Sequence, residues 1–118
     1  MTDRQTLGKK GEDYAACRLE RAGLTIVARN YRCPKGEMDI IARDSGVLVF
    51  IEVRTRRTAF RGWGEESVTS SKTGRLRAVA AYYLLNEGYT AWPEMRFDVV
   101  AVRWVGEEPQ WNWIRAAF

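Results

Sequence analysis

The chain has 118 residues, a net charge of +4 and a hydrophobic content of 46%. This length predicts one domain over residues 1–118, and the hydrophobic content excludes a disordered chain. The absence of histidine excludes mechanisms that use a histidine base, so carboxylates, lysines or arginines must carry any chemistry.

The first half of the chain predicts one helix followed by three strands. A helix is expected over residues 6–22, and Gly23 ends it. Its apolar stripe, with Glu12 at the border, consists of Leu7, Gly11, Ala15, Leu19 and Ala22. Apolar and β-branched residues predict strands over residues 24–31, 37–43 and 47–55. The last two strands flank Asp44-Ser45-Gly46, which is a strong hairpin signal.

The second half predicts a loop, a helix and two strands. Residues 56–68 are polar, contain glycine and lack periodicity, so we expect a surface loop. A helix follows from Ser70 or Ser71 to Asn86. Its buried face is predicted to consist of Leu76, Val79, Ala80, Tyr83 and Leu84. Strands over residues 95–104 and 111–115 complete the order α-β-β-β-α-β-β, which indicates an α/β fold with a mixed β-sheet and flanking helices.

The hairpin brings acidic residues together if its loop has two residues, Ser45 and Gly46. Paired positions then sum to 91, so Asp39 lies opposite Glu52 and Glu37 lies opposite Arg54. A three-residue loop would break both pairs. The other face of the hairpin is expected to be wholly apolar, and it consists of Met38, Ile40, Ala42, Val49, Ile51 and Val53.

Two opposed carboxylates in the middle of apolar strands call for a cation between them. Mg²⁺ suits Asp39 and Glu52, because it takes one or two carboxylates and keeps its other sites for water and phosphate oxygens. Glu12 and Glu37 are candidate additional ligands. The alternative is that these carboxylates are solvated at strand ends or paired with Arg54.

Positive charge is concentrated in one segment of the chain. Residues 54–77 contain only two carboxylates and seven cations, which are Arg54, Arg56, Arg57, Arg61, Lys72, Arg75 and Arg77. Lys72, Arg75 and Arg77 lie in the first two turns of the second predicted helix, where backbone N–H groups also favour a phosphate. A solvated basic face explains this cluster equally well. Trp63 could stack on a base or hold the loop against the domain.

Four motifs occur together in order along the chain. They are Gly11-Glu12, GEMDIIA at residues 36–42, FIEVRTR at residues 50–56 and RFDVV at residues 96–100. With them the chain resembles the YraN family of small bacterial proteins from about Leu7 to Val102. That family is similar to the archaeal Holliday-junction resolvases and the wider PD-(D/E)xK nucleases, which implies a restriction-endonuclease-like fold.

The resemblance implies a role for each matching residue. Asp39 and Glu52 correspond to metal ligands, and Glu12 is similar to a helix-borne acidic residue that completes the site. Arg54 takes the place of the motif lysine, and Lys72 matches a basic residue from the following helix. Since an arginine stays protonated, Arg54 can hold a phosphate but cannot act as a base. The resemblance also implies a homodimer.

Neither a membrane nor an oxidising compartment is indicated. No run approaches the roughly 20 apolar residues of a membrane span, and residues 1–5 lack the apolar core of a signal peptide. Cys17 and Cys33 are too few for a zinc site and are expected to be reduced thiols. We therefore expect a cytoplasmic protein.

Three functions remain open at this point. The first is a Mg²⁺- or Mn²⁺-dependent endonuclease that acts on structured or branched DNA, with the seven cations of residues 54–77 along the nucleic acid. The second is a nucleic-acid-binding module that keeps the fold but does not cut. The third is a protein-interaction domain whose tryptophans and cations contact a partner.

Overall fold

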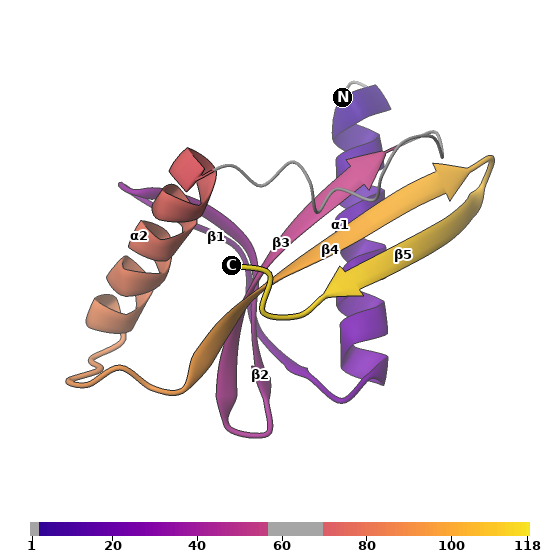
Figure 1. Ribbon diagram of the computed structural model, residues 1–118. Coiled ribbons are helices and arrows are strands. Elements are labelled where there is room, and N and C mark those ends of the chain that lie inside the picture. The colour runs from indigo at the N-terminus through magenta and orange to yellow at the C-terminus, as the bar shows by residue number, and fades with distance from the viewer. Residues whose placement is uncertain (1–2, 57–69) are drawn as a thin grey trace.

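The computed structural model describes residues 3–56 and 70–118, which form two helices and five strands (Figure 1). The helices are α1 (Asp3–Arg21) and α2 (Ser70–Asn86). The strands are β1 (Thr25–Cys33), β2 (Gly36–Asp44), β3 (Val47–Arg56), β4 (Met95–Val105) and β5 (Glu108–Ile114). This order confirms the predicted α-β-β-β-α-β-β arrangement. The loop predicted at residues 56–68, with Trp63, lies outside the described residues apart from Arg56, which ends β3.

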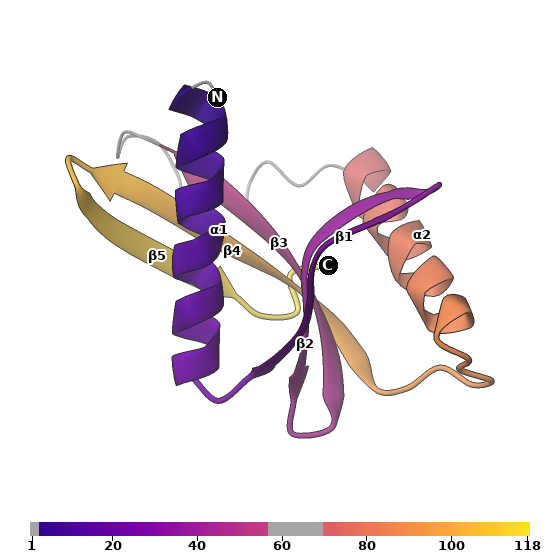
Figure 2. The same cartoon turned by 180° about the vertical axis from the view of Figure 1, so that it is seen from behind.

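The strands form one mixed sheet in the order β1-β2-β3-β4-β5. Only β3 and β4 are parallel, and the chain between them includes α2. The other neighbouring strands are antiparallel. Figures 1 and 2 show the two helices on opposite faces of the sheet. Each face therefore has its own hydrophobic core.

The two cores use the helical stripes that the sequence predicts. On one face, Ala15 and Leu19 of α1 are fully buried in a cluster with residues of β2, β3 and β4. On the other face, the buried residues of α2 are Leu76, Val79, Ala80, Tyr83 and Leu84, as predicted. Ala22, however, is exposed, because α1 ends at Arg21 and the chain turns away at Gly23.

The β2–β3 register confirms the two-residue turn. Ser45 and Gly46 have φ angles of 51° and 92°, which are the positive values that a tight hairpin turn requires. The paired residues run from Asp44↔Val47 to Ile40↔Ile51. The ladder ends there, so the predicted pairs of Asp39 with Glu52 and of Glu37 with Arg54 do not form as ladder pairs.

Beyond Ile40 the sheet divides into two arms. The part of β2 from residue 36 to 38 pairs only with β1, and the part of β3 from residue 52 to 56 pairs only with β4. We call this division the fork. Met38 also departs from the predicted face: it is buried with the α2-side cluster, whereas Ile40 is buried with the α1-side cluster. The strict alternation assumed for β2 therefore fails at Asp39.

Candidate functional site

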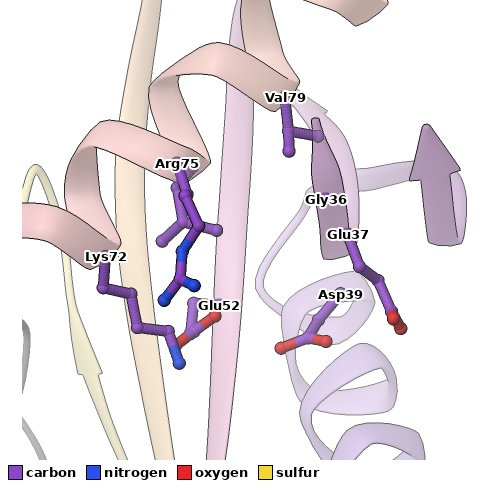
Figure 3. A pocket seen from close by; sticks show the side chains of 8 residues that line it. Gly36, Glu37, Asp39, Glu52, Lys72, Arg75 and Val79 are labelled. Atoms are coloured by element: carbon purple, nitrogen blue, oxygen red, sulfur yellow. The ribbon is translucent and has the colours of Figure 1, made fainter. Parts of the chain in front are cut away.

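A cavity of about 340 Å³ lies on the α2 side of the fork (Figure 3). Its lining residues are Gly36, Glu37, Asp39, Glu52, Lys72, Arg75, Leu76 and Val79. We call it the α2-side cavity. In Figure 3 the side chains of Lys72 and Arg75 descend from α2 toward Glu52, and Asp39 faces them from β2. Glu37 points away from Glu52. Three carboxylates and two cations therefore line the cavity, and Asp39 lies across it from Lys72 and Arg75.

Glu52 is a buried carboxylate that is held by two cations. Its Oε2 lies 2.7 Å from Nζ of Lys72 and 3.4 Å from Nη2 of Arg54. The Glu52 residue is only 8% exposed, and a carboxylate at this depth requires charge partners to offset its desolvation. The two partners come from different elements. Arg54 lies two residues after Glu52 on β3, and Lys72 approaches Oε2 of Glu52 from the first turn of α2.

Asp39 lies at the point where the fork opens. The backbone N–H of Val53 donates a hydrogen bond of 2.8 Å to its Oδ2, so the Asp39 side chain spans the gap left by the ladder. Burial is the main cause that raises the pKa of Asp39 to about 7. The negative charges of Glu52, Glu12 and Glu37 act in the same direction, and the Val53 hydrogen bond opposes them. A bound cation would favour the ionised form of this carboxyl.

Glu12 approaches Asp39 from the opposite face of the sheet. A second cavity of about 370 Å³, the α1-side cavity, is lined by Leu7, Gly8, Glu12, Asp39, Val53 and Thr55. Asp39 lines both cavities, because the fork leaves it accessible from either side. Oε1 of Glu12 accepts hydrogen bonds of 3.0 Å from Nη2 of Arg29 and from Nδ2 of Asn30.

Two glycines bring the helices close to the site. A Cβ atom at Gly11 of α1 would collide with the side chain of Thr55 on β3. At Gly36 of β2 a Cβ atom would lie 3.3 Å from Cγ2 of Val79 on α2, and its φ of 142° also favours glycine. Gly11 precedes Glu12 and Gly36 precedes Glu37, so each glycine of these motifs serves close packing beside an acidic residue.

The donor set fits a two-carboxylate magnesium site rather than a closed cage. In residues 3–56 and 70–118, no three acidic or cysteine side chains gather closely enough to hold a metal ion. Asp39 and Glu52 line the same cavity, and Mg²⁺ needs only one or two carboxylates when water and a phosphate supply the rest. The raised pKa of Asp39 agrees with this fit, because burial, its main cause, and the neighbouring carboxylates both disfavour the ionised form that a bound cation would stabilise.

The predicted basic residues that the structure describes divide into three groups. Lys72 and Arg75 line the α2-side cavity, and Arg54 contacts Glu52. The guanidinium of Arg77 instead lies 5.0 Å from the ring centre of Phe97 and 5.5 Å from that of Phe118. Arg56 is exposed at the end of β3. Arg57 and Arg61 lie outside the described residues.

The RFDVV motif of β4 is structural in this fold. Asp98 is fully buried and accepts hydrogen bonds from Nε of Arg96, Nε1 of Trp113 and the backbone N–H of Ala116. Nη2 of Arg96 also lies 3.0 Å from Oδ2 of Asp44. This network joins β4, the β2–β3 hairpin and the C-terminal residues. It lines neither of the two cavities at the fork.

Comparison with known proteins places this architecture in a family. Residues 11–102 match the model of the uncharacterised protein family UPF0102. The chain belongs to this family. The matched residues include the whole lining of the α2-side cavity, from Gly36 to Val79. This result agrees with the YraN resemblance drawn from the four motifs.

Bacterial UPF0102 proteins align with the chain over most of its length. The UPF0102 protein of Desulfitobacterium hafniense strain Y51 is 51% identical over 115 residues, covering 95% of each chain. That of Moorella thermoacetica is 50% identical over 99 residues, covering 84% of this chain and 82% of the relative. That of Nocardia farcinica is 44% identical over 117 residues, covering 98% of this chain and 91% of the relative.

Neither α1 nor α2, the helices in the described part, has the length and apolar content to span a membrane.

Proposed function

We propose that this UPF0102 protein is a divalent-cation-dependent nuclease that acts on structured or branched DNA. The observation that supports this function is the α2-side cavity, where Asp39 and Glu52 face Lys72 and Arg75. Metal-dependent phosphodiester hydrolysis uses carboxylates that hold a cation and side chains that hold a phosphate. The PD-(D/E)xK resemblance of the motifs favours the same reaction.

Asp39 and Glu52 would hold Mg²⁺ or Mn²⁺, with Glu12 or Glu37 as a further ligand. When bound, such an ion polarises a phosphodiester and lowers the pKa of a water molecule. Lys72 and Arg75 would bind the scissile phosphate. Arg56, Arg57 and Arg61 remain proposed contacts to the nucleic-acid backbone. Arg77 lies over two aromatic rings, so we expect it to stabilise the fold instead.

Lys72 supports catalysis in a chain that has an arginine at the motif lysine position. Arg54 cannot give up a proton near neutral pH. The ammonium of Lys72, on α2, lies 2.7 Å from Oε2 of Glu52, which is also the oxygen that Arg54 contacts. It is therefore the side chain best placed to stabilise negative charge that develops on a phosphate beside Glu52. Arg54 would hold the Glu52 carboxylate in its orientation.

Cleavage assays on matched substrates test the proposal. Purified protein is incubated with a four-way junction, a flap, a linear duplex and an RNA hairpin, each with Mg²⁺, Mn²⁺ or EDTA. We expect metal-dependent cleavage of the branched substrates, and its loss in Asp39→Ala and Glu52→Ala while DNA binding is kept. Cleavage that survives both substitutions would contradict the proposal, as would wild-type protein that cuts none of the substrates.

A binding module without cleavage is the second candidate. The Lys72–Glu52 ion pair favours it, because Glu52 already has a cation partner. This function predicts salt-sensitive nucleic-acid binding with no turnover in either metal. Cleavage gained by Arg54→Lys would indicate that such a module derives from an active nuclease.

The proposal includes two further expectations. A homodimer would allow two sites to act on two strands, and sedimentation analysis measures it directly. A cytoplasmic location agrees with the thiols of Cys17 and Cys33, which are free, since free cysteines are typical of a reducing compartment.

A further inference from the structure

Asn30 has an unusual backbone in the middle of a strand. Its φ angle is 53°, although it lies within β1, which runs from Thr25 to Cys33. A positive φ is uncommon for any residue with a side chain, but asparagine is among the residues that tolerate it best. Such a conformation persists only where the surrounding structure maintains it, and it is often found at functional sites.

The direction of side chains along β1 reverses at Asn30. Arg29 contacts Glu12 and Asp13 of α1, whereas Tyr31 packs edge-on against Tyr83 of α2, with ring centres 5.3 Å apart. In a regular strand, residues two positions apart share a face. Arg29 and Tyr31 therefore lie on opposite faces because the backbone turns at Asn30.

The neighbouring strand reverses at the matching position. The pairs Arg29↔Ile40 and Tyr31↔Met38 place Asn30 across from Asp39. Ile40 belongs to the α1-side core and Met38 to the α2-side core, so β2 also changes face at Asp39. The two strands thus share one kink, and Asp39 is the residue of β2 that lies in it.

The kink directs Asp39 into the fork. With its side chain at the turn between the two faces, Asp39 accepts the Val53 N–H and lines both cavities. On the α1 side, Nδ2 of Asn30 donates to Oε1 of Glu12 at 3.0 Å. Asn30 is therefore adjacent to two of the candidate metal-binding carboxylates: it lies across from Asp39 in the register, and its amide donates to Glu12.

We propose that Asn30 is a positioning residue of the site: its left-handed backbone turns Asp39 into the fork and its amide holds Glu12 toward the same point. A role of Asn30 in catalysis rests on the proposed nuclease function, whereas its role in positioning Asp39 and Glu12 does not. Glycine at position 30 would keep the kink and lose the amide contact, whereas alanine would disfavour the kink and also lose the contact.

Amide hydrogen exchange tests the backbone half of the proposal without metal or DNA. The Val53 N–H reports the position of Asp39, and Ile51, in the last β2–β3 ladder pair, is the internal reference. We expect Asn30→Ala to lower the protection of Val53 about tenfold relative to Ile51, because local opening of the kink releases the hydrogen bond. Asn30→Gly should keep this ratio, and Asn112→Ala on β5 is the remote control. The proposal would be overturned if the protection of Val53 relative to Ile51 stayed unchanged in Asn30→Ala, or if it fell in Asn30→Gly.

If Asn30→Ala does not fold, Asn30→Gly and Asn30→Asp decide. Both tolerate the left-handed backbone and should keep the Val53 protection. Mn²⁺ titration of wild type and Asn30→Gly then tests the amide half, with about tenfold weaker binding expected in the variant. Equal Mn²⁺ affinity in the two proteins would overturn that half. Absence of Mn²⁺ binding in wild type would contradict the nuclease proposal, while the exchange ratios would still decide the backbone role.

Discussion

Nζ of Lys72 lies 2.7 Å from Oε2 of Glu52, so α2 supplies an ammonium group to a buried carboxylate of β3. Arg54 occupies the position two residues after Glu52, where the resemblance to the PD-(D/E)xK nucleases implies a lysine. The Lys72–Glu52 contact therefore bears on the meaning of an arginine in place of a lysine at position 54. A lysine charge is present at the carboxylate, but it comes from α2 and not from β3.

Removing this ammonium should strengthen metal binding. In Lys72→Met, a divalent cation no longer competes with Nζ for Glu52, and we expect its affinity to rise about tenfold, or about 1.4 kcal/mol. DNA affinity should fall at the same time, because a phosphate contact is lost. Calorimetric titration with Mn²⁺ and a fluorescence binding assay measure the two effects. Arg75→Met is the matched control, and metal affinity that falls in Lys72→Met would contradict the competition.

Asp39 should make stability depend on pH in a defined window. Its pKa is raised from the ordinary value of 3.8 to about 7 in the folded protein. The native state therefore keeps a proton that the unfolded chain releases, and this stabilisation is complete below about pH 4 and lost as pH rises to about 7. The free energy of unfolding should decline by up to about 1.4 kcal/mol per pH unit in that window.

Asp39→Asn should remove this decline while still accepting the Val53 hydrogen bond. We expect the variant to be more stable than wild type at about pH 8 without metal, and the difference to shrink at about pH 5, as measured by urea unfolding. Asp13→Asn is a control of opposite sign. The hydrogen bond from Arg29 lowers the pKa of Asp13, so its stabilisation is present above about pH 4 and lost on acidification. If Asp39→Asn and wild type differed in unfolding free energy by the same amount at both pH values, Asp39 would not be the source of the pH dependence.

Arg75 and Arg77 should behave differently although they lie in the same helix. Arg75 lines the α2-side cavity, so Arg75→Ala should weaken DNA binding and reduce the salt dependence by about one counterion. Arg77 stacks over Phe97 and Phe118, so Arg77→Ala should instead lower the free energy of unfolding by roughly 0.5–1 kcal/mol. Binding isotherms at several salt concentrations and urea unfolding measure the two outcomes. Equal losses of binding in both variants would show that the whole basic face contacts DNA.

Gly11 should tolerate no side chain while Thr55 is present. In Gly11→Ala the new methyl group meets the Thr55 side chain, and we expect a loss of roughly 1–3 kcal/mol in unfolding free energy. Thr55→Ala removes the hydroxyl and methyl groups that would collide, so the double variant should recover part of the loss. Gly8→Ala, where the added Cβ would meet no atom, is the control within α1. Additive effects in the double variant would contradict the contact.

Features with a local cause can be predicted from the sequence. The hairpin register follows from Ser45-Gly46 together with the period-two apolar pattern, and the buried face of α2 follows from helical periodicity. Both depend on neighbouring residues alone. Asp39 and Glu52 also stand out locally, because they interrupt apolar strands, although the ladder pair predicted for them does not form.

Features that depend on distant contacts cannot be predicted in this way. The strand pattern assumes strict alternation, so it misses the kink at Asn30 and places Met38 on the wrong face. The contact of Arg77 with Phe118 cannot be predicted, because nothing in its own helix indicates that Phe118 lies beside it. Asp98 belongs to one of the four motifs, but only the fold reveals that Trp113 and Ala116 satisfy its carboxylate.

The exposed turn at Ser45-Gly46 has a consequence for how this chain can vary. Surface turns usually accept inserted or deleted residues, since few contacts depend on them. Here one inserted residue that shifted the β2–β3 register would exchange the faces of one strand and separate Asp39 from Val53. The length of this turn is therefore expected to be fixed among functional relatives, although neither of its residues touches the site.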